Sequence, residues 1–352
     1  MSNIIELQLP QAISFLIDEM ANFWNKIKAD FDSYDQKEKL ESKRIEYLLL
    51  RKKELFLKFN NYFEKLWVLI KDLDQKLYKQ TKAYYEEKMF NFLGKDIEIN
   101  MHIRSKPFGY GGDFLTMNYI YDYHRNKYLG ATTYQKFINH YTCNIEVANS
   151  NIRRKNYIKD LIIEHLLYNT SEPKRILSIG CGPAREIEEL IKENKIKSSV
   201  NFLLIDFESE ALAYVKEHLG VLKFNRDLVK INLIKTDLIR LLKDKILKSK
   251  ISSVDLIYIS GVFDYLSDRL CKRITKDALC LLNKKSTLLI ANMSAERASH
   301  RAYYETFGEW NMFHRKKEDM ISWVKSLSGD FSYKLLEIDG CKGYHFLQVK
   351  SA

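Results

Sequence analysis

The chain has 352 residues, of which 46% are hydrophobic and 29% are charged, and its formal net charge is +11. These values are ordinary for a soluble globular protein that is long enough for two domains. No apolar run approaches the roughly 20 residues of a membrane-spanning helix, which excludes membrane insertion. The N-terminal sequence lacks the features of a secretory signal, so we expect a cytoplasmic protein.

The positive charge raises nucleic acid as a partner. The lysines, however, are spread along the chain and mixed with acids, which is typical of a solvated surface and disfavours nucleic acid. The five cysteines are odd in number, widely spaced and without a CxxC pair, which indicates reduced thiols rather than disulfides or a zinc site. No cluster of His, Asp and Glu has metal-ligand spacing, so we expect no metal.

The first predicted region is helical. From Gln11 to Phe92 the sequence contains neither glycine nor proline, and apolar residues recur at helical spacing. These apolar residues form one broad stripe: Leu49, Leu50, Leu55, Phe56, Phe59, Phe63, Leu66, Trp67 and Ile70. The pattern predicts an α-helical cap, and its long helices could also pair in a homodimer.

A stretch rich in Gly and Tyr follows, SKPFGYGGDFLTMNYIYDYH at residues 105–124. Its glycines allow backbone conformations barred to other residues, so we expect a loop that leads into a short helix. A second helical stretch is predicted from Tyr134 to about Tyr168. We place the domain boundary here, with a cap domain at 1–133 and a second domain at 134–352.

After Pro173 the pattern alternates between continuously apolar strands and amphipathic helices. Five β/α units are followed by two strands with too short a connection for a crossover helix, which predicts an antiparallel hairpin at the sheet edge. The fold class is therefore α/β, a doubly wound Rossmann-like sheet with a C-terminal hairpin and an N-terminal helical cap.

Glycines and acids stand at the ends of successive predicted strands, where ligands bind in doubly wound sheets. RILSIGCGPAREIEELI, residues 175–191, combines a strand, a Gly-x-Gly turn and a helix N-terminus. Asp206 at the end of the second predicted strand is placed to accept hydrogen bonds from ribose hydroxyls. Asp237 after the third strand could accept a hydrogen bond from an adenine amino group, or could only cap the following helix. The candidate cofactor-binding residues are Gly180, Cys181, Gly182, Asp206, Phe207, Asp237, Leu238, Ser260, Gly261 and Phe263.

These features resemble the class I S-adenosylmethionine (SAM) dependent methyltransferases over residues 134–350. The resemblance implies SAM as the cofactor, since nicotinamide-binding Rossmann domains lack the terminal hairpin. Two positions depart from the class. Ser178 stands where an acid often lies close to the methionine part of SAM, and Ala184 replaces the third glycine. The amino-acid end of SAM is therefore expected to be held by other residues, including ones from the cap.

A narrower resemblance rests on KPFGYGGDFLTMNYIY, LSIGCGPAREI, GVFDYLSDRL and GEWNMFHRKKEDM. These motifs are similar to those of a bacterial subfamily that includes methyltransferases making 3-hydroxy fatty acid methyl esters and SAM-dependent azetidine-2-carboxylate synthases. They do not separate the two reactions. The leading expectation is methyl transfer to a small molecule, with a carboxylate oxygen as the acceptor. The alternatives are cyclisation of SAM to azetidine-2-carboxylate and methylthioadenosine, a nucleic-acid-binding methyltransferase, and SAM binding without catalysis.

The Gly-Tyr loop has two interpretations. As a lid it would bring tyrosine faces to the sulfonium and Asp113 to the α-ammonium, with Tyr110, Asp113 and Tyr121 as catalytic candidates. As a hinge, its tyrosines would only pack against the sheet domain and would have no role in catalysis. The substrate candidates are Asn118, Trp310 and Arg315; Glu309 lies beside them, and a packed Trp with a surface Arg is the alternative.

Overall fold

The computed structural model describes residues 9–126, 128–167, 172–296 and 299–352. The chain divides into two compact units. A helical unit contains Met1–Ala148 and Ser299–Asn311, and a sheet unit contains Asn149–Ala298 and Met312–Ala352. The segment 299–311 thus joins the N-terminal helices although it is distant in sequence. The predicted domain boundary after residue 133 stays a prediction.

The helical unit is built on long amphipathic helices. Their bounds are α1 Gln11–Lys37, α2 Glu41–Ile70, α3 Gln75–Leu93, α4 Glu98–Ser105, α5 Phe114–Asn126 and α6 Thr133–Thr142, with α7 Glu146–Leu166 leading into the sheet unit. α1 buries a stripe with steps of three and four residues: Ile13, Leu16, Ile17, Met20, Trp24, Ile27 and Phe31. Trp24 stacks on Phe59 of α2, with 4.0 Å between ring centroids.

The apolar stripe of α2 is buried over most of its length. Leu55, Phe59, Phe63, Leu66 and Ile70 are buried, and Phe56 and Trp67 are half-buried. Leu49 and Leu50 lie off the buried face and are 45% and 79% exposed. Leu48 is buried instead, because it lies seven residues before Leu55 and therefore on the same face.

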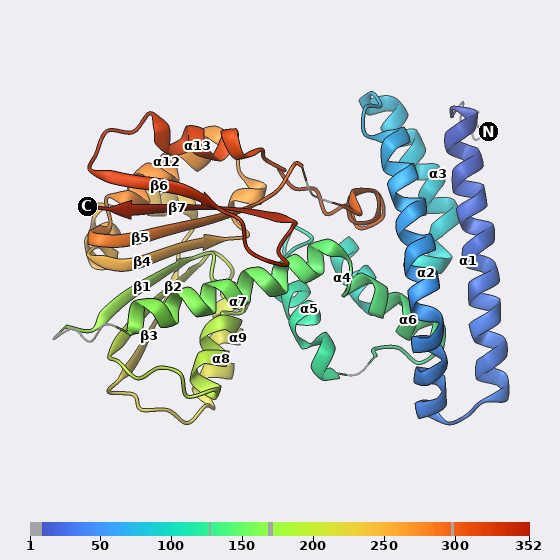
Figure 1. Cartoon of the computed structure of the whole chain (residues 1–352), viewed down its shortest axis with the longest axis horizontal. Coiled ribbons are helices and arrows are strands. Elements are labelled where there is room, and N and C mark those ends of the chain that lie inside the picture. Colours follow the sequence, from blue (N-terminus) through green and yellow to red (C-terminus); the bar gives the residue numbers. More distant parts are fainter. Residues whose placement is uncertain (1–8, 127, 168–171, 297–298) are drawn as a thin grey trace. The chain divides into compact units, whose positions relative to one another are not determined.

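The sheet unit contains a seven-stranded sheet within the described residues (Figure 1). The strands are β1 Lys174–Ile179, β2 Val200–Asp206, β3 Val229–Lys235, β4 Val254–Ser260, β5 Leu282–Met293, β6 Phe331–Leu336 and β7 Tyr344–Ser351. Their order is β3-β2-β1-β4-β5-β7-β6. β1 to β5 pair in parallel, whereas β7 is antiparallel to both β5 and β6. This confirms the predicted fold class.

Helices cover both faces of the sheet. α12 and α13 lie on one face, and α7, α8 and α9 lie on the other (Figure 1). The bounds are α8 Arg185–Lys192, α9 Ser209–Gly220, α10 Leu238–Lys243, α11 Lys245–Ile251, α12 Asp268–Leu279 and α13 Lys317–Lys325. A short turn of 3-10 helix, η1 (Phe263–Tyr265), follows β4, and a π-helical turn, η2 (Ala302–Phe307), lies in the helical unit. The sequence did not predict α13.

Three predicted elements have different limits in the structure. The helical stretch predicted from Tyr134 is two helices, α6 and α7, and its end at Tyr168 lies outside the described residues. The helix predicted after the third strand breaks at Asp244, which caps α11 by accepting a hydrogen bond from the Leu247 amide at 2.9 Å. β5 begins at Leu282 rather than Ser286.

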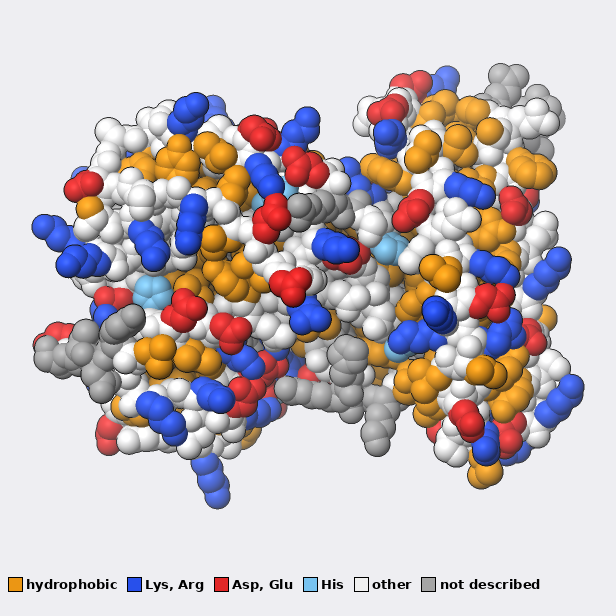
Figure 2. Space-filling model, viewed as in Figure 1, with side chains coloured by type: hydrophobic (Ala, Val, Ile, Leu, Met, Phe, Trp, Pro, Cys, Tyr) orange, Lys and Arg blue, Asp and Glu red, His pale blue; other side chains and the backbone are white. Residues whose placement is uncertain are grey.

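Positive side chains are spread over the surface. On the face shown in Figure 2, Lys and Arg are interspersed with Asp and Glu. α12 departs from this pattern, because four of its cations recur at helical spacing on one face: Arg269, Lys272, Arg273 and Lys276. Arg273 also lies 3.5 Å from a carboxylate oxygen of Asp277.

Candidate functional site

The strand order reverses between β1 and β4, so the crevice for a ligand is expected at the carboxyl ends of these strands. The turn after β1 has left-handed backbone at three positions, with φ of +72° at Gly180, +51° at Gly182 and +47° at Ala184. The two glycines differ. A Cβ on Gly180 would lie 2.2 Å from Cγ2 of Val262, whereas a Cβ on Gly182 would have no neighbour within 4 Å. Gly180 therefore permits close packing, and Gly182 leaves open space at the turn.

Asp206 joins this turn to the end of β2. Its carboxylate accepts hydrogen bonds from the amides of Gly182 at 2.9 Å and Glu208 at 3.1 Å. Burial raises the pKa of Asp206, and the backbone hydrogen bonds oppose that rise. Phe207 beside it is 53% exposed, and the Cys181 thiol is buried, which raises its pKa well above the usual value. Asp206 and the Gly182 turn therefore lie together, as the sequence predicted for a single site.

The third strand end is different. Asp237 is exposed, and its carboxylate caps α10 by accepting a hydrogen bond from the Arg240 amide at 2.8 Å. Leu238 after it is half-buried. The helix-cap alternative therefore describes the geometry of Asp237, and a contact of either residue with adenine stays a prediction.

The loop after β4 contains a glycine packed against Arg154 and a phenylalanine buried in the core. Gly261 has a φ of +83°, and a Cβ there would lie 3.2 Å from Nη1 of Arg154. Ser260 is half-buried at the end of the strand. Phe263 is fully buried in the core, with its ring centroid 5.2 Å from that of Trp323. Any ligand contact of Phe263 would therefore involve its backbone.

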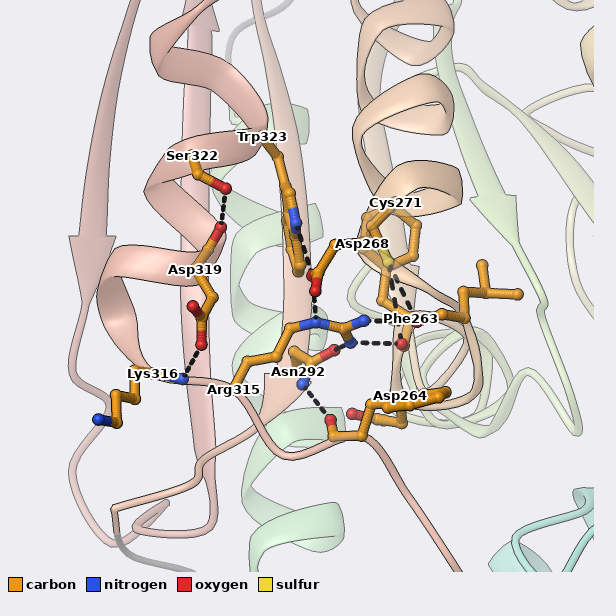
Figure 3. A network of polar contacts seen from close by, with 12 residues as sticks. Phe263, Asp264, Asp268, Cys271, Asn292, Arg315, Lys316, Asp319, Ser322 and Trp323 are labelled. Atoms are coloured by element: carbon orange, nitrogen blue, oxygen red, sulfur yellow. Dashed lines mark hydrogen bonds and ion pairs between the residues drawn. The ribbon is translucent and has the colours of Figure 1, made fainter.

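Arg315 is buried and serves this same loop (Figure 3). Its Nη1 donates to the carbonyl of Phe263 and to Oδ1 of Asn292, each at 2.7 Å, and its Nε donates to Asp268 at 2.9 Å. Its Nη2 donates to the Leu266 carbonyl. A substrate carboxylate would have to replace one of these partners, so that role of Arg315 stays a prediction.

Several buried charged residues at the strand ends were missed by the sequence reasoning. Asp264 is 1% exposed and its carboxylate accepts a hydrogen bond from the Met293 amide at 2.6 Å. Burial raises its pKa to about 6, although Arg154 and Arg315 favour the charged form. Glu186 in the first turn of α8 is also buried and accepts a hydrogen bond from the Tyr258 hydroxyl at 2.7 Å.

Arg154 of α7 is a buried cation whose charge acts on Glu186 and Asp264. Its Nη1 donates to the Tyr344 hydroxyl at 2.7 Å, and its guanidinium lies 4.6 Å from the centre of that ring. The sheet unit thus contains three buried acids, Asp206 at the end of β2, Glu186 in the first turn of α8 and Asp264 after β4, and Arg154 acts on the last two through its charge. An apolar spacing pattern carries no signal for such residues, because charged residues in a helix usually face solvent.

The remaining candidates lie in the helical unit. Asp113 is fully buried, lies 2.9 Å from Nε2 of His102 and accepts a hydrogen bond from the Thr116 amide at 2.8 Å. Trp310 is 3% exposed, and a Cβ on Gly111 would lie 2.9 Å from the Cβ of Trp310, so this loop packs tightly against that side chain. Three further residues belong to the same stretch, with Asn118 buried and the tyrosines half-buried: Tyr110, Asn118 and Tyr121.

Glu309 stands beside Trp310 and is paired with cations of the same unit. It forms ion pairs with Lys82 and with Lys106, the latter at 3.0 Å. The hydrogen bond from Lys82, opposed by partial burial, lowers the pKa of Glu309 to about 2. Glu309 therefore holds the segment 299–311 to the N-terminal helices.

Comparison with known proteins agrees with this architecture. Residues 170–340 match the family model described as a methyltransferase domain, whereas no curated protein matches the sequence. A possible exported protein from Bordetella parapertussis has a similar fold, with a TM-score of 0.54 and 13% identity over 73% of this chain and 87% of that chain. An O-methyltransferase family protein from Burkholderia thailandensis has a TM-score of 0.42 and 11% identity over 78% and 71% of the two chains.

The sheet order and the family match together define the class. The chain carries a class I methyltransferase domain, so it is an enzyme, a transferase that uses SAM as its cofactor. None of the described helices is long and apolar enough to span a membrane. In the described part of the chain, no group of three or more His, Cys, Asp or Glu side chains is arranged to hold a metal ion.

Proposed function

We propose that this methyltransferase binds SAM at the carboxyl ends of β1, β2 and β4 and methylates a small molecule, with a carboxylate oxygen as the leading acceptor. The observation that carries the proposal is the open space at Gly182 beside the buried carboxylate of Asp206. SAM supplies an activated methyl group and carries two positive charges, on its sulfonium and its ammonium.

The residues present fit such a ligand. A backbone without side chain at Gly182 and Gly261 admits close approach, and Asp206 is placed to accept hydrogen bonds from ribose hydroxyls. The buried carboxylates Glu186 and Asp206 favour a cationic ligand, since burial without full charge compensation is costly. Phe207, Asp237, Leu238 and Ser260 complete the proposed adenosine site.

The Gly-Tyr loop is proposed to supply the catalytic groups Tyr110, Asp113 and Tyr121, and Asn118, Trp310 and Arg315 are proposed to contact the acceptor. Two buried cations support an anionic acceptor, Arg154 beside Gly261 and Arg315 beneath the loop after β4. Because an in-line methyl transfer depends mainly on orientation, we assign the loop a positioning and water-excluding role.

We propose that the chain belongs to the narrower bacterial subfamily it resembles. Two reactions of that subfamily are candidates, methyl ester formation on a 3-hydroxy fatty acid and cyclisation of SAM to azetidine-2-carboxylate. The test is incubation with SAM, with and without a 3-hydroxy fatty acid, followed by analysis of the nucleoside. S-adenosylhomocysteine formed only with the acceptor would support methyl transfer. Methylthioadenosine formed without an acceptor, together with an equal amount of azetidine-2-carboxylate, would support cyclisation and contradict the leading proposal. A sample without enzyme corrects for spontaneous breakdown of SAM to methylthioadenosine.

A nucleic acid acceptor is the second candidate, and the basic face of α12 favours it. The leading proposal predicts that RNA binding is weak and is lost at about 150 mM salt. Binding of single-stranded RNA that survives this salt, and that is abolished in the double variant Arg269→Glu/Lys272→Glu, would reverse the ranking.

Two further proposals concern the state of the protein in the cell. A homodimer is supported by exposed apolar residues that recur along one line of α2, at Leu50, Leu57 and Val68. A cytoplasmic location is supported by the cysteines, since all five lie in the described part of the chain and none is in a disulfide. Sedimentation of the wild type against Leu57→Glu would test the dimer.

A further inference from the structure

The position that often carries an acid in this class is occupied by Ser178, two residues before Gly180. Ser178 is buried in β1 and lies opposite Tyr258 of β4 in the parallel ladder, so both side chains point to the same face of the sheet. α8 covers this face (Figure 1). A short side chain at Ser178 leaves the space beside it to a residue from that helix.

Glu186 is that residue. It is 8% exposed, and its Oε1 accepts a hydrogen bond from the Tyr258 hydroxyl at 2.7 Å. Burial raises the pKa of Glu186, and the Tyr258 hydrogen bond opposes this rise. Burial and the Glu186 charge raise the pKa of Tyr258 well above its usual value, so the phenol remains a donor to the carboxylate.

The neighbouring acids have other partners. Asp206 accepts from two backbone amides, and Glu189 is paired with Lys155 at 2.5 Å. Glu188 on the same helix pairs with Lys192 and lies 3.3 Å from Arg185. Glu186 differs from these, because the hydrogen bond to its carboxylate comes from a neutral hydroxyl, and the cations Lys155 and Arg154 act on it only through their charge. A buried carboxylate of this kind gains most from a cationic ligand.

We propose that Glu186 binds the α-ammonium of the methionine part of SAM and that Tyr258 positions its carboxylate. The acid is thus supplied by the first turn of α8 instead of by β1. This inference rests on the proposed SAM site. It also removes the need for Asp113 of the loop to bind the ammonium, because Asp113 is already bonded to His102 and to the Thr116 amide.

The test compares two ligands that share the nucleoside. S-adenosylhomocysteine carries the amino-acid end, and methylthioadenosine lacks it. Calorimetry on Glu186→Gln should show affinity for S-adenosylhomocysteine reduced by roughly tenfold or more, while affinity for methylthioadenosine is unchanged. Tyr258→Phe should show a smaller reduction with the same ligand selectivity. Glu189→Gln, a half-buried acid on the same helix, is the matched control and should change neither affinity.

Three results would overturn the assignment: equal loss for both ligands in Glu186→Gln, no loss for either, or the same selective loss in Glu189→Gln. If Glu186→Gln does not fold, Glu186→Asp takes its place, with the same selective loss expected because the shorter carboxylate is withdrawn from the ammonium. If the wild type binds neither S-adenosylhomocysteine nor methylthioadenosine, the proposed SAM site itself is contradicted. Loss of both ligands in Asp206→Ala with no effect in Glu186→Gln would overturn this inference alone.

Discussion

Buried carboxylates have different hydrogen-bond partners in the two units. In the helical unit, Asp113 is enclosed by His102 and by the Thr116 amide at the start of α5, which is the arrangement of a helix cap with a paired imidazole. In the sheet unit, the carboxylates of Glu186, Asp206 and Asp264 accept from neutral hydroxyl or amide groups, and burial raises the pKa of each. The units therefore differ in whether a buried acid is paired with an imidazole, and the proposed SAM site uses Glu186 and Asp206, whose hydrogen bonds come from a hydroxyl and from amides.

The largest expected effect on stability comes from a substitution in the turn after β1, which includes Gly180 and Gly182. Gly180→Ala combines a left-handed φ with a Cβ 2.2 Å from Val262, so we expect a loss of about 3 kcal/mol or more in the free energy of unfolding. Gly182→Ala enters open space, so it should cost only about 1–2 kcal/mol through its φ. Gly182→Ala should nevertheless lose SAM affinity.

Urea unfolding and calorimetry on the two variants check this pair. The claim that Gly180 is required for close packing against Val262 would be contradicted if Gly180→Ala were as stable as the wild type. The claim that SAM lies against Gly182 would be contradicted if Gly182→Ala bound SAM as tightly as the wild type.

A second prediction uses the pH dependence of stability. Burial raises the pKa of Asp264 from 3.8 to about 6, so the folded state binds more protons in that window. Stability should therefore fall as the pH rises from about 4 to 6, by up to about 3 kcal/mol. Asp264→Asn keeps an acceptor for the Met293 amide and removes this dependence.

The difference in melting temperature between Asp264→Asn and the wild type should thus grow in favour of the variant as the pH rises across this window. A difference that stays constant would show that the Asp264 carboxylate is not penalised by burial.

The third prediction tests whether the Gly-Tyr loop is a lid or a hinge. Asp113→Asn weakens the bonds with His102 and the Thr116 amide, so we expect a loss of about 1–3 kcal/mol of stability. Tyr110→Phe should leave the melting temperature unchanged and slow turnover, since it keeps the ring and removes the hydroxyl. Steady-state kinetics beside thermal melting of both variants decide the matter. Normal turnover in both would leave the loop with a structural role only.

The centre of the sheet could be predicted from the sequence because β1, β2 and β4 are apolar runs that end at a glycine or an acid. The terminal hairpin was predicted from the short connection between its strands, whereas the strand order was not predicted and comes from the structure. Gly182 and Asp206 were predicted to share a site and do lie together. α13 was not predicted, because it has only nine residues and its buried apolar positions are only Met320, Trp323 and Val324, which is too short a run for a clear helical period.

The buried charges could not be predicted in the same way. Glu186 stands in a helix rich in acids, and only the fold distinguishes it from Glu188 and Glu189 by placing it against Tyr258 of a strand 72 residues later. Arg315 was expected either to pair with a substrate carboxylate or to lie at the surface, and it is buried because the loop after β4 presents carbonyl groups to it. Both depend on contacts between distant segments, which local spacing does not encode.

The most direct test of the account is calorimetric titration of SAM into the wild type, Asp206→Ala and Asp244→Ala. Asp206 accepts from the amides of Gly182 and Glu208 at the proposed ribose site, whereas Asp244 only caps α11. We predict that Asp206→Ala loses roughly tenfold to a hundredfold in affinity, which corresponds to about 1.5–3 kcal/mol, and that Asp244→Ala binds as the wild type does. Unchanged affinity in a folded Asp206→Ala protein would contradict the placement of SAM at these strand ends.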